Sequence, residues 1–203
     1  MKSFALALGG GGARGLGHIA VIEALDEMGV RPTAIAEMER LMDWLAGHLP
    51  PAGPVRLVHG DFRVDNVIVA PDGPNVRAVI DWELATLGDP LADFTYHLMQ
   101  WHMPASEGGA DPGTIAGFDL AALGIPSLAA YVDAYVRRTG LDPRPHLPVY
   151  FAYNFFRIAA IYQGIAGRVR DGTASSEHAA ERALMVAPLA RKAWQFAQAA
   201  GAR

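Results

Sequence analysis

The stretch His59-Gly60-Asp61-Phe62-Arg63-Val64-Asp65-Asn66, with Ile80-Asp81-Trp82-Glu83 further along, decides how this chain is expected to fold. Between them lie short apolar runs at 67–70 and 76–80, separated by Pro71-Asp72-Gly73-Pro74, which is typical of a β-hairpin. Such a hairpin would return Asp81 to the side of Asn66. An Asn and an Asp so placed can hold Mg²⁺, and Asp61 can accept a hydroxyl proton, so the sequence predicts groups that phosphoryl transfer needs. The alternative is an ordinary hairpin whose Asp, Asn and Gly residues serve turns and caps.

These motifs resemble those of the aminoglycoside phosphotransferase and choline kinase group, relatives of protein kinases, whose catalytic loop has the form His-Gly-Asp-x-x-x-x-Asn. The resemblance implies Asp61 as the catalytic base, Asn66 and Asp81 as Mg²⁺ ligands, and ATP as the phosphoryl donor. It also implies supporting roles for His59 and for Asp89, which opens the next helix. Arg63, inside the loop, is expected either to orient a substrate or to be solvated. The acceptor that the resemblance implies is a small molecule with a hydroxyl group.

Within this group the chain is most similar to the kinase-like domain related to that of some acyl-CoA dehydrogenases. The stretches that carry this resemblance are Arg56-Leu57-Val58-His59-Gly60-Asp61, 81–90 and 119–126. Members of that family have a whole N-terminal lobe, with a glycine-rich phosphate loop and a strand Lys paired with a helix Glu. The only lysines here are Lys2 and Lys192, so we expect this lobe to be missing and the chain alone to be weakly active or inactive. The exposed lobe face is then expected to favour self-association or a protein partner.

The glycine-rich segment near the N-terminus has a different character. It fits G-x-G-x-x-G between a strand and a helix, but it also resembles the opening of patatin-like lipid acyl hydrolases. In that resemblance the backbone N–H groups of Gly10, Gly11 and Gly12, with Arg14, form an oxyanion hole. The Gly-x-Ser-x-Gly nucleophile elbow expected after Ala36 is replaced by Glu37-Met38-Glu39-Arg40, so we expect at most a vestigial acyl hydrolase.

Two units are expected, and together they predict a protein of the α/β fold class. Residues 1–36 are predicted to form a β-α-β element, and residues 37–203 a mostly helical, protein-kinase-like C-terminal lobe that carries the catalytic-loop hairpin. The predicted helices of the lobe span 37–49, 92–101, 128–138, 149–168 and 176–199. A noncatalytic binding module with the same helices remains the alternative of a different class.

The overall composition narrows the range of partners and compartments. With 203 residues of which 51% are hydrophobic, the chain can build a globular core. A net charge of −4 and the lack of a Lys/Arg block argue against nucleic acid or an anionic membrane as the main partner. No apolar run approaches the roughly 18 residues of a membrane span, and the run 4–8 is too short for a signal peptide. With no Cys, the chain is expected to be cytoplasmic.

Overall fold

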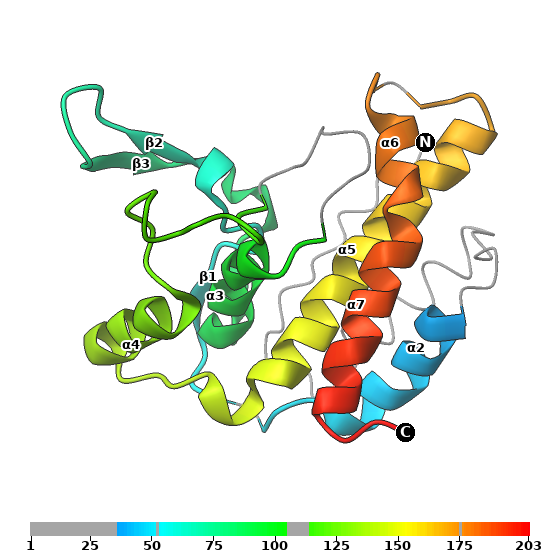
Figure 1. Ribbon diagram of the computed structural model, residues 1–203, viewed down its shortest axis with the longest axis horizontal. Helices are drawn as coiled ribbons and strands as arrows, with labels where there is room; N and C mark the ends of the chain where they lie inside the picture. The colour runs from blue at the N-terminus through cyan, green and yellow to red at the C-terminus, as the bar shows by residue number, and fades with distance from the viewer. Residues whose placement is uncertain (1–35, 52, 105–113, 175) are drawn as a thin grey trace.

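The computed structural model describes residues 36–51, 53–104, 114–174 and 176–203, which form a mostly helical lobe with two small antiparallel sheets (Figure 1). The mixed helical and small-sheet fold class predicted for the lobe is therefore confirmed. The glycine run, Arg14 and the predicted β-α-β element lie outside the described residues, apart from Ala36. Ala36 was expected to end a strand, but it begins helix α2.

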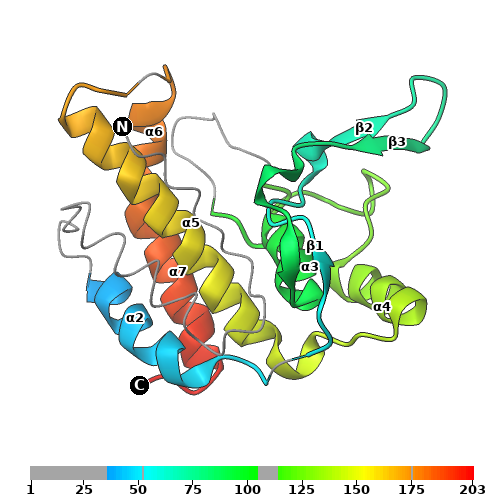
Figure 2. The ribbon, with the colours of Figure 1, turned by 180° about the vertical axis from the view of Figure 1, so that it is seen from behind.

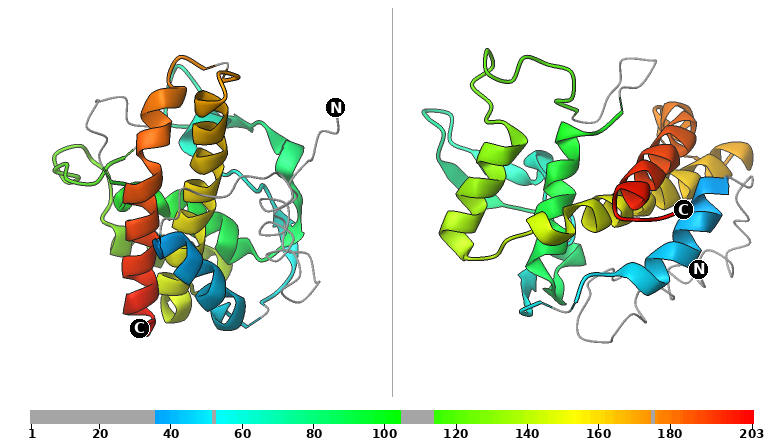
Figure 3. Two further views of the ribbon diagram at one scale, coloured as in Figure 1. Left: turned by 90° about the vertical axis from the view of Figure 1, so that its right-hand side faces the viewer. Right: turned by 60° about the horizontal axis from the view of Figure 1, so that its bottom comes forward.

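Three helices lie side by side and bury most of the core: α2 (Ala36–His48), α5 (Leu147–Arg170) and α7 (Val186–Ala199) (Figures 1 and 3). Their apolar residues recur at helical spacing, which places them on one face of each helix. The largest side chains that are fully buried in this layer are Leu41, Phe155 and Leu189. Burying one such side chain contributes on the order of 2 kcal/mol to the stability of the fold.

The last predicted helix, 176–199, is divided in the structure. Helix α6 (Ala179–Leu184) ends before Met185, and α7 begins at Val186. Pro188 explains this break, because it lacks the N–H that would bond to the carbonyl of Leu184, and its ring crowds that carbonyl. In the first turn of α7 the missing N–H has no cost, since first-turn N–H groups have no partner within the helix.

Helix α3 (Pro90–Leu98) packs against α5 through a buried polar contact as well as through apolar side chains. Asn154, fully buried in α5, donates its side-chain amide to the hydroxyl of Thr95 in α3 over 3.0 Å. The Thr95 hydroxyl in turn donates to the carbonyl of Leu91, 2.6 Å away. This contact fixes α3 on α5. As a result, residues of both helices meet at residues 59–66, the catalytic-loop motif.

The four strands in the described residues form two separate pairs, and the catalytic-loop motif lies between them. Strand β1 (Arg56–Val58) pairs with β4 (Thr86–Gly88), and β2 (Val67–Val69) pairs with β3 (Val76–Val79). The second pair is the predicted hairpin, which projects away from the helices (Figure 2). Strand β4 was not expected, because Thr86-Leu87-Gly88 is too short to show a strand pattern in the sequence.

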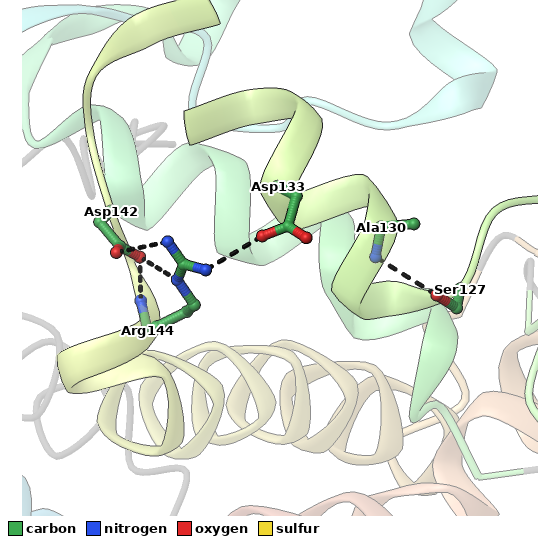
Figure 4. A network of polar contacts seen from close by, with 5 residues as sticks. All are labelled: Ser127, Ala130, Asp133, Asp142 and Arg144. Atoms are coloured by element: carbon green, nitrogen blue, oxygen red, sulfur yellow. Dashed lines mark hydrogen bonds and ion pairs between the residues drawn. The ribbon is translucent and has the colours of Figure 1, made fainter. Parts of the chain in front are cut away.

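Helix α4 (Leu128–Thr139) lies beside α3, and an ionic network fixes the turn that connects it to α5. Arg144 donates to Asp133 over 3.0 Å and makes two side-chain bonds of 2.8 Å to Asp142 (Figure 4). The N-terminus of α4 is capped by the Ser127 hydroxyl, which accepts the N–H of Ala130. None of the helices in the described part of the chain combines the length and apolar character that a membrane span needs.

Candidate functional site

The candidate site begins with a tight turn at Gly60, whose φ of 84° lies in the left-handed region that favours glycine. A Cβ on Gly60 would stand 2.5 Å from the carbonyl oxygen of Leu84. Leu84 ends the short helix η2 (Trp82–Leu84), which directly follows Asp81. Glycine therefore permits the loop before Asp61 to pack closely against the segment after Asp81.

The backbone of the turn at Gly60 is held by the carboxylate of Asp93, a role that the sequence did not indicate. Asp93 of α3 accepts the backbone N–H of His59 over 2.7 Å and the N–H of Gly60 over 3.0 Å, one with each oxygen. Bonds from N–H groups to an ionised carboxylate are about twice as strong as neutral ones. Asp93 thus fixes the two residues that precede Asp61.

The imidazole of His59 joins the catalytic loop to the end of β3. The N–H of Asp61 donates to Nδ1 of His59 over 3.3 Å, and Nε2 of the same ring lies 2.8 Å from the carbonyl of Ile80. A backbone N–H can only donate and a carbonyl can only accept, so the two contacts assign the neutral tautomer with its proton on Nε2. The ring is buried and packs against the indole of Trp82, with centroids 4.7 Å apart.

Asn66, at the end of the same loop, lies beside Asp61. Its side-chain nitrogen donates to the main-chain carbonyl of Asp61 over 2.9 Å and to Oδ2 of the Asp61 carboxylate over 3.3 Å. Because the nitrogen takes both of these contacts, the Asn66 side-chain oxygen remains the group that can bind a cation. The carbonyl of Asn66 also accepts the N–H of Ile80 over 2.9 Å, which closes the base of the hairpin next to Asp81.

Asp81 is exposed and has an unusual backbone conformation, with φ 68° and ψ 52°. It is the only non-glycine residue with positive φ in the described part of the chain. This conformation costs an L-residue free energy, although Asp tolerates it better than most. Strain of this kind is often retained where a side chain must be aimed in a particular direction.

The oxygen atoms of Asn66 and Asp81 suit Mg²⁺ chemically, because this ion prefers carboxylate and carbonyl ligands and keeps several waters. In the described residues there is no group of three or more His, Cys, Asp or Glu side chains that could hold a metal by itself. The donors here therefore fit a cation that is shared with phosphate groups, and not one held by a closed protein cage.

Asp89 and Arg63 are the other predicted site residues in the described part of the chain, and each contacts residues other than Asp61. Asp89 caps α3: its carboxylate accepts the N–H of Leu91 over 2.9 Å and the hydroxyl of Tyr150 over 2.6 Å. Burial and the neighbouring Asp89 raise the pKa of Tyr150, so it donates as a neutral hydroxyl. Arg63 precedes η1 (Val64–Asn66) and pairs with Asp65 in the same loop.

Two further residues near Asp61 were missed at the sequence level. Arg157 of α5 donates from Nη2 to the carbonyl of Gly60 over 2.6 Å, and its guanidinium lies over the ring of Tyr96 in α3. In the sequence, Arg157 is the only charged residue between Leu147 and Gly167, an otherwise apolar stretch. A lone charge on a core-facing helix was the signal that could have identified it.

Comparison with known proteins adds a family match and several relatives. The profile described as the phosphotransferase enzyme family matches residues 22–144. A solved structure from Ralstonia eutropha, described as a candidate aminoglycoside phosphotransferase, is 41% identical with a TM-score of 0.83. The match covers 94% of this chain and 57% of that one, so the kinase-like phosphotransferase fold expected from the motifs is present.

Two curated relatives are much longer proteins. Acyl-CoA dehydrogenase family member 10 of Mus musculus is 41% identical over 174 residues, which are 84% of this chain and 16% of the relative. Acyl-CoA dehydrogenase family member 11 of Gallus gallus is 38% identical over 168 residues, which are 82% and 22%. The chain thus spans less than a quarter of the length of these two proteins.

Proposed function

Because the chain belongs to the phosphotransferase enzyme family, we propose that it transfers a phosphoryl group from ATP, bound with Mg²⁺, to the hydroxyl of a small molecule. The observation that carries this proposal is the junction of the catalytic loop and the hairpin. There the Asn66 side chain contacts the Asp61 carboxylate, and the Asn66 carbonyl bonds to the residue before Asp81. These contacts support a site in which Asp61 accepts a proton and Asn66 and Asp81 supply oxygen ligands for a cation.

The roles of the chain's own residues follow from this geometry. Asp61 accepts the proton of the attacking hydroxyl as the new O–P bond forms and the bond between the γ-phosphorus and the β–γ bridging oxygen breaks. Asn66 and Asp81 would hold the cation through their side-chain oxygens. When bound, Mg²⁺ would offset charge on the transferring and leaving phosphates. His59, Asp89 and Asp93 keep the loop and α3 in place.

The direct test is transfer of labelled γ-phosphate to a panel of hydroxylated small molecules in the presence of Mg²⁺. Asp61→Asn should remove the transfer, while Asp72→Asn, at the exposed tip of the hairpin, should leave it unchanged. Transfer that persists in the Asp61 variant would refute the role of Asp61. If no acceptor on the panel is phosphorylated in an Asp61-dependent way, the proposal fails.

We also propose that the chain assayed alone is a weak catalyst. A kinase-type lysine neutralises phosphate charge, but Lys192 lies on α7 over the ring of Phe196, and Lys2 lies outside the described residues. Each missing electrostatic contact typically costs on the order of 10²-fold in rate. Micromolar ATP affinity measured by calorimetry, with fast Asp61-dependent turnover, would contradict this expectation.

The cytoplasm stays our proposed location, because a reaction that uses ATP needs a compartment that contains ATP.

The acyl-hydrolase alternative rests on Gly10, Gly11, Gly12 and Arg14, which lie outside the described residues, so no described contact bears on it. We propose that the chain has no such activity, because none of its five Ser residues stands in a Gly-x-Ser-x-Gly motif. A fluorophosphonate probe should label no serine. Labelling that disappears when Arg14 is changed would overturn this proposal.

A further inference from the structure

The peptide unit between Gly60 and Asp61 is fixed at both of its polar ends. Its carbonyl accepts a 2.6 Å hydrogen bond from Nη2 of Arg157, and its N–H donates to Nδ1 of His59 over 3.3 Å. A peptide plane held on both sides cannot rotate without breaking one of these bonds. The direction in which the Asp61 side chain leaves the backbone is therefore set partly by a residue far away in the sequence.

Arg157 has few partners for its charge, which makes its position informative. No ion pair of Arg157 is found within the described residues, and its Nε is buried there without a hydrogen-bond partner. Partial burial of a guanidinium without a carboxylate partner costs free energy. What it gains here is the Gly60 carbonyl and the face of the Tyr96 ring, whose centroid is 4.8 Å from its central carbon.

Tyr96 supports the same arginine through the face of its ring. Its side chain is only 7% exposed, and it lies in α3 under the Arg157 guanidinium. Burial raises the pKa of Tyr96, and the charge of Asp61 raises it further, so the ring carries a neutral hydroxyl. The guanidinium is therefore held against α3 by this ring.

We propose that Arg157 is a positioning residue for Asp61. Arg157 holds the Gly60–Asp61 peptide through the Gly60 carbonyl, and Tyr96 carries the guanidinium on its ring. For catalysis this rests on the proposed function, since Asp61 must first be the base. The two residues come from the two helices, α3 and α5, that the buried Asn154 joins. Helix packing and the orientation of the base are thus linked.

The first test does not depend on turnover. In Arg157→Met, the amide proton of Asp61 should exchange faster by about tenfold or more, because the charge-assisted bond that restrains its peptide is gone. Arg157→Lys should restore part of the protection, and Arg168→Met, on the exposed side of the same helix, should leave it unchanged. Faster exchange throughout α5 and α7 would show a merely structural role and refute the proposal. Unchanged exchange at Asp61 would also refute it.

The second test concerns the ring of Tyr96. Tyr96→Phe keeps the ring under the guanidinium, so the Asp61 amide should stay protected. Loss of that protection in Tyr96→Phe would contradict the support of Arg157 by the ring. In the labelled-phosphate assay, Arg157→Met should lower Asp61-dependent kcat about 10- to 100-fold with little change in the KM for ATP.

The two proposals can fail separately. If the unaltered chain shows no Asp61-dependent transfer, the proposed function fails, and the exchange measurement still decides whether Arg157 positions Asp61. If transfer is Asp61-dependent but Arg157→Met leaves kcat unchanged, the positioning role is refuted and the function stands.

Discussion

At the scale of single residues, Asp81 joins a strained backbone to the proposed cation site. Its left-handed φ of 68° is tolerated by Asp better than by Ala, because a short polar side chain can bond to the local backbone. We expect Asp81→Ala to abolish the weak Mn²⁺ binding of the chain and to lower the free energy of unfolding by about 1 kcal/mol. Mn²⁺ titration followed by electron paramagnetic resonance, with urea unfolding, measures both. Asp72→Ala should change neither, and unchanged Mn²⁺ binding in Asp81→Ala would disprove the site.

Gly60 and Gly117 offer a matched pair for measuring how much the close approach at the catalytic loop costs. Their φ values are 84° and 85°, but a Cβ would meet the Leu84 carbonyl at 2.5 Å in one case and nothing within 4 Å in the other. Gly117→Ala should cost about 1 kcal/mol from φ alone. Gly60→Ala should cost roughly 2 kcal/mol more, because backbone must move. Denaturant unfolding of both variants gives the difference, and equal losses would mean that the loop can shift freely.

At the scale of elements, the N-terminal part of α3 supports the site through the carboxylates of Asp89 and Asp93. Asp93→Asn would replace one oxygen that accepts a backbone N–H with an NH₂ group that cannot, at a contact now 2.7 or 3.0 Å long. We expect a loss of about 1–3 kcal/mol in the free energy of unfolding and faster amide exchange at His59 or Gly60. The matched variant Asp43→Asn, in α2, should leave both measurements unchanged. Normal exchange at both amides in Asp93→Asn would contradict the assigned contact.

The packing of α3 against α4 should depend on pH through His97. This ring is buried next to the Tyr131 hydroxyl, 3.1 Å from Nε2, and burial lowers the pKa of His97 below its ordinary value of 6.5. The fold favours the neutral ring, so its contribution is fully present above the ordinary pKa and is lost as the pH falls below it. Urea unfolding at about pH 8 and about pH 5 should show a smaller loss of stability in His97→Gln than in the unaltered chain. Equal losses would exclude His97 as a source.

Most elements could be predicted from sequence because their patterns are local. The helical spacing of Met38, Leu41 and Leu45 indicates where α2 lies. The division of 176–199 required weighing Pro188 against an otherwise continuous helical pattern. Strand β4 could not be predicted, because three residues have no periodicity of their own and are ordered by pairing with β1.

The candidate site was predictable to the extent that its parts are neighbours in the chain. The contact between Asn66 and Asp61 follows from a motif with fixed spacing, and the hairpin accounts for the place of Asp81. Asp93, Tyr96 and Arg157 reach the same loop only through the packing of α3 and α5. No pattern along the chain states which turn of one helix faces which loop, so these residues stayed hidden.

At the scale of the whole molecule, apolar side chains remain exposed on the strand side. Leu57 and Leu87 face each other across β1 and β4 and are 64% and 60% exposed. We expect the chain to self-associate through this pair as its concentration rises, because exposed apolar clusters favour association. In sedimentation velocity, Leu57→Lys combined with Leu87→Glu should abolish the concentration dependence. Leu184→Lys, which alters an isolated exposed residue of α6, should not, and association that survives the double change would place the contact elsewhere.

The bond between Arg157 and the Gly60 carbonyl also has a consequence for the order in which the molecule is made. Gly60 leaves the ribosome 97 residues before Arg157 does, and Asp89 leaves it 61 residues before Tyr150. During synthesis the contacts that Arg157 and Tyr150 make can therefore form only late. The hairpin can form early, because its two strands are close in sequence. The nascent chain should pass through a stage in which the hairpin exists but the Asp61 side chain has no fixed direction. Chemistry would become available only when the C-terminal helices close over the loop.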